Sequence, residues 1–248
     1  MKKLFLTLLI LIAACAVQAQ KKYYPQVLIE LYSSEGCESC PYADKFVKEI
    51  LHIADSVKQP VYVIDFHVDI WDRSGWKDPY SDSTFSKRQF LAAHRVGQPA
   101  IFTPMIFVNG IGGLPGAAKG EVGFYINNSL KEPREHNVVT QANVYEGKNT
   151  LSIDYEIEGK TDSLEIHFAL IEKHVFSKVT AGENHGKTLE HHNVVRKFAT
   201  QVVQSNKGHY ELPMPKDAMT DLKKFGLVTF LQWKKGGYIF AVDELLFK

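Results

Sequence analysis

The chain has 248 residues, of which 45% are hydrophobic and 23% are charged, with 29 Lys and Arg against 28 Asp and Glu. This length and composition exclude a disordered chain, a collagen-like chain and a small disulfide-rich protein, and they leave room for two ordinary domains. The near-zero net charge gives no general attraction to nucleic acid or to anionic membranes, so we expect neither as a partner.

Residues 1–19 have the pattern of an export signal. Two lysines precede a short apolar stretch, and Val17-Gln18-Ala19 fits a signal-peptidase site. The stretch is shorter than the roughly 20 apolar residues that a membrane-spanning helix needs, and no other segment of the sequence is long enough. We therefore predict a signal peptide over residues 1–19 and an exported protein, periplasmic or secreted. The alternative is a bacterial lipobox, Ile12-Ala13-Ala14-Cys15, in which Cys15 would carry a lipid anchor.

Removal of the signal leaves two cysteines, Cys37 and Cys40, separated by two residues. In an oxidising compartment such a pair is a redox centre, half of a zinc site or a structural disulfide. A structural zinc site needs four ligands, and the sequence has no second cysteine pair. A disulfide that closes so short a loop removes little chain entropy. The pair is therefore best interpreted as a redox centre.

A strand–turn–helix pattern surrounds the two cysteines. Residues 27–32 form an apolar run typical of a buried strand, and apolar residues recur at helical spacing from Pro41 onward. Cys37 is therefore predicted at a helix N-terminus, where the helix dipole and free amides stabilise the attacking thiolate. Cys40, one turn further, is predicted as the more buried, resolving thiol. The charge of Glu38 opposes a thiolate, which predicts a mild acidification of Cys37 and favours a reductant or isomerase over a strong oxidant.

Residues 61–67 are predicted as a second strand and residues 85–96 as a crossover helix. The strand–helix–strand order that starts at Val27 implies that the first two strands are parallel. Ligand sites in such sheets lie beyond the carboxyl ends of the strands, so His67 and Asp69 are expected at the same edge as Cys37. His67 is a candidate for proton transfer or for metal binding, although bracing by Asp69 or Asp72 is the preferred interpretation.

Two further side chains are candidates near this edge. Trp71 is expected as packing that also walls a cleft. Glu30, inside the first strand, is either a buried carboxylate that relays a proton to Cys40 or an outward-facing side chain, because alternation does not decide which face it occupies.

The pattern changes near residue 137. Short alternating runs with turn residues between them predict strands over residues 138–145, 151–157, 164–171, 227–233 and 238–242. Regular strands of this spacing are typical of a β-sandwich. The polar segment Gly182–Arg196 interrupts them and holds His185, His191 and His192. It is either a metal-binding loop or, preferably, a surface loop that docks on the N-terminal half.

Two segments resemble a known superfamily. Leu31-Tyr32-Ser33-Ser34-Glu35-Gly36-Cys37-x-x-Cys40-Pro41 resembles the active-site loop of glutaredoxins and thioredoxins, and the run from Phe102 to Gly110 resembles the loop and hairpin that carry their cis-proline. The resemblance implies that Pro104 faces the cysteine pair and that Thr103 lies in the substrate groove. It also implies that Gly112 and Gly113 start the last helix beside this groove.

The whole chain resembles an exported bacterial family labelled as domain of unknown function 1223. The matching stretches are Ser33–Pro41, Phe66–Asp72, Gly75–Pro79, Thr103–Gly110, Gly182–Asn184 and Asn193–Arg196. The resemblance implies an α/β thioredoxin-like domain over residues 20–135, followed by an all-β sandwich-like domain over residues 136–248.

Three functions are compatible with these patterns. The preferred one is an exported thiol–disulfide oxidoreductase in which Cys37 attacks, Cys40 resolves and Pro104 shapes the groove. Its partners would be protein or small-molecule thiols and disulfides, and it would need neither a cofactor nor a resident metal. The second is a copper or zinc binding or delivery protein with Cys37, Cys40 and His67 as ligands. The third is a non-catalytic binding module.

Overall fold

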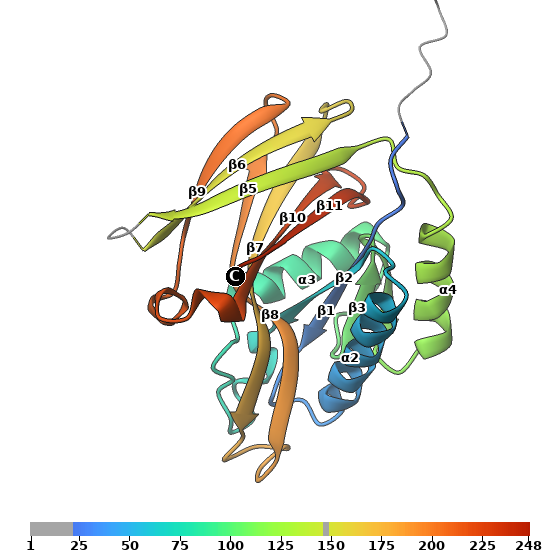
Figure 1. Ribbon diagram of the computed structural model, residues 1–248. Helices are drawn as coiled ribbons and strands as arrows, with labels where there is room; N and C mark the ends of the chain where they lie inside the picture. Colours follow the sequence, from blue (N-terminus) through green and yellow to red (C-terminus); the bar gives the residue numbers. More distant parts are fainter. Residues whose placement is uncertain (1–21, 146–148) are drawn as a thin grey trace, which may run out of the picture.

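The computed structural model describes residues 22–145 and 149–248, so the predicted signal peptide and Cys15 lie outside the described residues. Strands dominate the described part. One mixed sheet has eight strands in the order β11-β10-β7-β8-β2-β1-β3-β4, and a second sheet has three strands in the order β5-β6-β9. Figure 1 shows the smaller sheet at one end of the molecule and the helices at the other.

The elements follow one another along the chain in this order: β1 (Val27–Ser33), α2 (Cys40–Ser56), β2 (Val61–His67), η1 (Asp69–Trp71), α3 (Ser83–Arg95), β3 (Met105–Val108), β4 (Ile111–Pro115), α4 (Lys119–Ser129), β5 (Asn137–Tyr145), β6 (Thr150–Glu158), β7 (Leu164–Lys178), β8 (Thr188–Val202), β9 (Lys207–Pro213), η2 (Lys216–Met219), η3 (Leu222–Lys224), β10 (Phe225–Trp233) and β11 (Ile239–Leu246).

The expected fold class, a thioredoxin-like α/β domain followed by a β-sandwich, is wrong. Strands β7, β8, β10 and β11 do not build a sheet of their own with β5 and β6, because they extend the sheet that contains β1–β4. The junction lies between β2 and β8, where Asp65 pairs in parallel with Val194. The Asn193 side chain reinforces it by donating to the Val63 carbonyl oxygen over 2.9 Å. An alternating pattern predicts an individual strand but does not indicate which distant strand it pairs with.

Strands β1 and β2 lie inside this large sheet and pair in parallel, from Val27 opposite Val61 to Ser33 opposite His67. All seven residues of β1 are buried, because both of its faces are covered. Leu28 and Tyr32 belong to the apolar cluster that includes residues of α3, and Ile29 and Leu31 belong to the cluster that includes residues of α2 and α4. Because β1 and β2 are parallel, their carboxyl ends lie at the same edge of the sheet.

Two local expectations are also corrected. Gly112 and Gly113 lie in β4 and do not start a helix, because α4 begins later, at Lys119. The segment Gly182–Arg196 is not a single loop. Strand β8 begins at Thr188 and pairs with β7, so His191 and His192 occupy a strand.

Candidate functional site

Cys37 and Cys40 lie at the junction between β1 and α2. Helix α2 begins at Cys40, and Pro41 occupies its first turn, where a missing amide leaves no hydrogen bond unmade. Cys37 therefore precedes the helix at its N-terminal end. Its Sγ lies 3.5 Å from the Ser39 hydroxyl and 3.7 Å from the Thr103 carbonyl oxygen.

The two thiols have pKa values moved in opposite directions. The hydrogen bond from Cys40 is the largest cause that lowers the pKa of Cys37 to about 6, with smaller contributions from Thr103 and Ser39 against the cost of burial. Burial is the largest cause that raises the pKa of Cys40 well above its ordinary value, and the charge of Asp44 adds to it. At neutral pH Cys37 is therefore the thiolate and Cys40 the thiol, which is the division of roles that thiol exchange requires.

The Thr103–Pro104 peptide bond is cis, and the residue before the proline, Thr103, has its carbonyl oxygen 3.7 Å from Cys37 Sγ. The amide of Gly116 donates to the Pro104 carbonyl oxygen over 2.9 Å. A Cβ atom at Gly116 would lie 2.6 Å from Pro104 Cγ and 2.8 Å from Ala43 Cβ. Gly116 is thus a glycine at which a side chain would collide with Pro104 and with α2. Pro115-Gly116 is a recognisable turn signal in the sequence, but nothing in it indicates this contact.

Trp71 borders the cysteine loop. Its indole nitrogen donates to the Thr103 hydroxyl over 2.6 Å, and its Cβ lies 3.0 Å from the position that a Cβ at Gly36 would take. Both cysteines are buried, with Cys37 2% exposed and Cys40 1% exposed. Because Trp71 contacts the residue before Cys37 and bonds to Thr103, we call it the lid. Asp69 is not part of this arrangement, because it exchanges hydrogen bonds with Ser86 on α3.

The connection between β7 and β8 holds the cysteine loop from the other side. Asn184 donates from its side-chain amide to the carbonyl oxygens of Glu35, over 2.8 Å, and of Cys37, over 2.9 Å. The Glu183 carboxylate accepts from the amide of Glu38 over 2.9 Å. Sequence reasoning assigned no site role to these two residues, although docking of this segment on the N-terminal half was expected.

His67 ends β2 and is fully buried between two carboxylates. Its Nδ1 lies 2.7 Å from Asp78 Oδ2, and its Nε2 lies 3.2 Å from Asp65 Oδ2. Burial lowers the pKa of His67, but the two carboxylates outweigh burial and raise it well above its ordinary value. The bracing partners are thus Asp78 and Asp65 rather than the expected Asp69 and Asp72.

His191, on β8, lies next to His67, with ring centroids 4.7 Å apart. Its Nδ1 is 3.2 Å from Asp44 Oδ2 and its Nε2 is 3.5 Å from Glu35 Oε1. Burial lowers the pKa of His191, and the Asp44 and Glu35 carboxylates raise it to about 9. Burial raises the pKa of Asp44. The structure therefore brings together Cys40, Asp44, His191 and His67, of which the sequence predicted only the first and last as neighbours.

Glu30 lies on the opposite face of β1. Its carboxylate accepts from Nε of Arg88 over 2.8 Å and from Nη2 over 2.7 Å, and the Tyr32 hydroxyl donates to it over 3.2 Å. This buried pair joins β1 to α3 and places Glu30 away from α2. The structure does not bring the predicted relay residue to Cys40.

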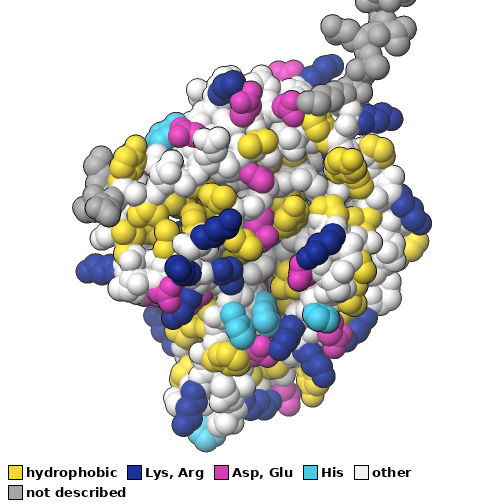
Figure 2. Space-filling view, viewed as in Figure 1, with side chains coloured by type: hydrophobic (Ala, Val, Ile, Leu, Met, Phe, Trp, Pro, Cys, Tyr) yellow, Lys and Arg dark blue, Asp and Glu magenta, His cyan; other side chains and the backbone are white. Residues whose placement is uncertain are grey.

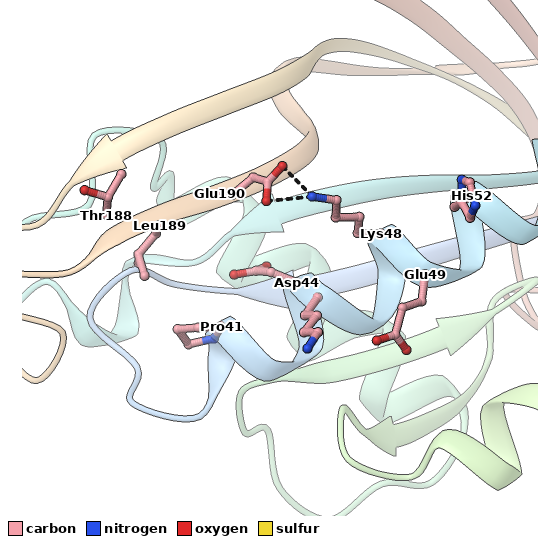
Figure 3. Close-up of a pocket in the computed structure, with 9 residues that line it drawn as sticks. Pro41, Asp44, Lys48, Glu49, His52, Thr188, Leu189 and Glu190 are labelled. Carbon is pink, nitrogen blue, oxygen red and sulfur yellow. Dashed lines mark hydrogen bonds and ion pairs between the residues drawn. The ribbon is translucent and has the colours of Figure 1, made fainter.

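A cavity of about 480 Å³ opens between α2 and β8. Figure 3 shows its two walls, with Lys48 on α2 bonded to Glu190 on β8 and Asp44 between them. It is lined by Pro41, Asp44, Lys45, Lys48, Glu49, His52, Thr188, Leu189 and Glu190. In the space-filling view, His, Lys and acidic side chains gather over this part of the surface (Figure 2).

Two groups of potential metal ligands occur within residues 22–145 and 149–248. The buried group is Asp65, His67 and His191, and the more exposed group is His174, Glu190 and His192. Neither group contains a cysteine. The predicted ligand set of Cys37, Cys40 and His67 is thus not assembled in the described part of the chain.

Residues 28–232 match the family model described as "Protein of unknown function (DUF1223)". The chain belongs to this family. The match confirms the family expected from the sequence motifs, and it spans both the cysteine loop and strand β8. No curated protein matches this member of the family.

A crystal structure of an Agrobacterium tumefaciens protein is similar to this DUF1223 chain, with a TM-score of 0.67 and 20% sequence identity. The similarity covers 91% of this chain and 96% of that one, so the two share a fold. A domain of the outer membrane lipoprotein Omp28 from Porphyromonas gingivalis matches 46% of this chain and 95% of its own length, with 17% identity and a TM-score of 0.24. No helix in the described residues is both long and apolar enough to cross a membrane.

Proposed function

We propose that this DUF1223 protein is an exported thiol–disulfide oxidoreductase. The observation that carries the proposal is the asymmetry of the cysteine pair: the pKa of Cys37 is lowered to about 6, whereas that of Cys40 is raised well above its ordinary value. A structural disulfide needs no such difference, but an attacking thiolate beside a resolving thiol does. The resemblance of the loop to thioredoxins and glutaredoxins supports the same reaction class.

The reaction balances with the two cysteines alone. The Cys37 thiolate attacks one sulfur of a substrate disulfide, forms a mixed disulfide and releases the other substrate sulfur as a thiolate. Cys40 then loses its proton and attacks Cys37 Sγ, which forms the Cys37–Cys40 disulfide and releases the second substrate thiolate. Two electrons pass from the protein to the substrate, and the reverse sequence oxidises a dithiol.

Asp44 is the group best placed to accept the proton of Cys40. It follows Cys40 by one helical turn on α2, and its charge is among the causes that raise the Cys40 pKa. Asp44 also lines the cavity between α2 and β8, so the proton has a route to solvent. The substrate would enter beside Thr103, whose carbonyl oxygen lies 3.7 Å from Cys37 Sγ, and Trp71, which bonds to the Thr103 hydroxyl, would have to move to admit it.

The export part of the proposal is supported by the signal pattern of residues 1–19. In an oxidising compartment client disulfides are available to the pair. Lipidation at Cys15 is the alternative form of the same proposal, and it would place the enzyme on a membrane surface. The clients would be protein or small-molecule thiols and disulfides.

A trapping experiment tests the proposal. Cys40→Ser removes the resolving thiol, so we expect the variant to accumulate a mixed disulfide with its client that dithiothreitol releases. Cys37→Ser and the Cys37→Ser, Cys40→Ser double variant are matched controls that should trap nothing. The wild-type protein should also reduce a model disulfide in the presence of a dithiol donor. Absence of both trapping and reductase activity would contradict the proposal.

The near-complete burial of both sulfurs favours a second candidate, a non-catalytic binding module. Cys37 is 2% exposed and Cys40 1% exposed, so a client cannot reach either sulfur without a local opening. In that case Cys37 of the folded protein would react with iodoacetamide only as fast as the chain unfolds. A rate well above the unfolding rate would exclude this candidate.

A further inference from the structure

We infer that Asp65, His67 and His191 form a buried binding site for a divalent metal ion of the zinc type. The three side chains come from β2 and β8, the strands whose pairing joins the two halves of the large sheet. The inference is independent of the thiol chemistry, because no cysteine belongs to the group.

The distances between the donor atoms suit a tetrahedral ion. One ligand atom from each of the three residues lies within 4.8 Å of those of the other two. Zinc bonds of 2.0–2.2 Å to nitrogen and oxygen place tetrahedral ligand atoms about 3.3 Å apart. The separation of His67 Nε2 and Asp65 Oδ2 is 3.2 Å. The His191 ring, whose centroid is 4.7 Å from that of His67, would supply the third ligand.

Several polar atoms of the cluster are buried without a well-aligned hydrogen bond. Both ring nitrogens of His191 and the Oε1 atom of Glu35 are of this kind, although each nitrogen lies within 3.5 Å of a carboxylate oxygen. The side chains are 1% and 0% exposed, so bulk water does not satisfy them. Such atoms are rare in folded proteins, because each costs desolvation without recovering a hydrogen bond. An ion bound to His191 Nε2, with a bound water that donates to Glu35 Oε1, would give both of these atoms a partner.

Each histidine also has a carboxylate on its other side, as metal-binding histidines usually do. His67 Nδ1 is 2.7 Å from Asp78, which would leave Nε2 free for the ion. His191 Nδ1 is 3.2 Å from Asp44, which would leave its Nε2 free in the same way. These outer carboxylates orient the rings and raise the basicity of the ligating nitrogens.

The charge of the cluster suits a cation. Four buried carboxylates, those of Glu35, Asp44, Asp65 and Asp78, surround two imidazoles, and no Lys or Arg of the described residues is ion-paired with them. The cavity between α2 and β8 supplies an entry path, because Asp44 lies in its wall and contacts His191.

The exposed group, on β7 and β8, differs from the buried one and gives a control. His174 and His192 stack with centroids 4.7 Å apart, and both face Glu190. Lys48 already neutralises this carboxylate, with its Nζ 2.8 Å from each oxygen. A His174→Ala, His192→Ala double variant removes this group and leaves the buried one intact.

The experiment measures zinc and cobalt binding to the full mature chain that carries this double variant, refolded with and without the metal. We expect one zinc per chain. Bound cobalt should give tetrahedral d–d bands without a thiolate-to-cobalt band, and X-ray absorption should show nitrogen and oxygen neighbours with two imidazoles. Adding Asp65→Asn should weaken binding by at least about tenfold. The matched Asp69→Asn change should leave binding unaltered.

The outcomes separate this inference from the proposed oxidoreductase. The Cys37→Ser, Cys40→Ser variant should bind zinc as the parent does, even though it traps no client. Absence of stoichiometric metal from the refolded chain, a thiolate-to-cobalt band, or equal affinity after Asp65→Asn would each overturn the inference. The X-ray absorption spectrum needs no change in the buried cluster, so it decides the matter even if the Asp65→Asn protein fails to fold.

Discussion

The two faces of β1 hold their buried charges in different ways. On the face toward α3, Glu30 is paired with Arg88, whose guanidinium carbon lies 4.6–5.5 Å from the centres of three aromatic rings. On the face toward α2, carboxylates are balanced by His67 and His191. A guanidinium does not release its proton, whereas an imidazole exchanges a proton for another proton or a metal. We therefore expect the first face to serve stability and the second to serve the proposed chemistry.

Breaking the Glu30–Arg88 pair tests the stability side of this comparison and has the largest expected effect. Arg88→Met leaves a buried carboxylate without its partner, so we expect the free energy of unfolding to fall by about 3–5 kcal/mol. Urea unfolding followed by circular dichroism measures it. The rate of Cys37 alkylation in the folded state should not change, because the pair lies on the other face of β1.

The Glu30→Gln, Arg88→Met double variant is the control for that prediction. Removing both charges leaves no unpaired ion, so most of the lost stability should return. If the double variant were as unstable as Arg88→Met alone, loss of packing against Phe66 and Phe198 would explain the effect better than the buried charge.

A substitution at Gly116 tests the face toward α2, and its expected effect is intermediate. A Cβ there would press on Pro104 Cγ at 2.6 Å and on Ala43 Cβ at 2.8 Å. Gly116→Ala should therefore cost about 1–3 kcal/mol of unfolding free energy by overpacking and should change the alkylation rate of Cys37. Gly123→Ala, inside α4, meets nothing within 4 Å. It should add up to about 1 kcal/mol of stability. Equal results for the two variants would mean that Pro104 is not held by this contact.

The local structure around the cysteines was predictable because it depends on near neighbours in the sequence. The apolar run of residues 27–32 and the helical spacing after Pro41 correspond to β1 and α2. The fold class was not predictable in the same way. The single pairing of Asp65 with Val194 joins segments more than a hundred residues apart, and no periodicity reports it.

The site was predicted in part for a related reason. Cys37 and Cys40 are recognisable from their spacing, but His191 sits in a polar run that reads as a loop. That run forms β8 because polar side chains are buried against partners from other segments, as Asn193 is against Val63 and His191 is against Asp44. Glu30 shows the converse, since its partner Arg88 determines the face on which it lies.

The smallest expected effect is that of a substitution at Trp71, the lid beside the cysteine loop. Trp71→Phe keeps most of the ring but loses the hydrogen bond from the indole nitrogen to Thr103, which is worth about 1 kcal/mol. If the lid must open before Cys37 reacts, iodoacetamide alkylation should become up to about fivefold faster. Trp76→Phe is the matched control, because it removes an indole bond to Glu35 and leaves Trp71 in place.

The pH dependence of the alkylation rate shows whether Trp71 limits access to Cys37 or lowers the pKa of its thiol. The pKa of Cys37 is about 6, so alkylation should accelerate as the pH rises through that value and level off above it. Trp71 bonds to Thr103, which is only a smaller cause of the lowered Cys37 pKa, so the variant should raise the plateau and move the midpoint little. A midpoint that moved toward the ordinary thiol value at an unchanged plateau would mean that Trp71 maintains the thiolate instead of covering it. The reactivity of this face would then depend on the electrostatics of the loop and not on access.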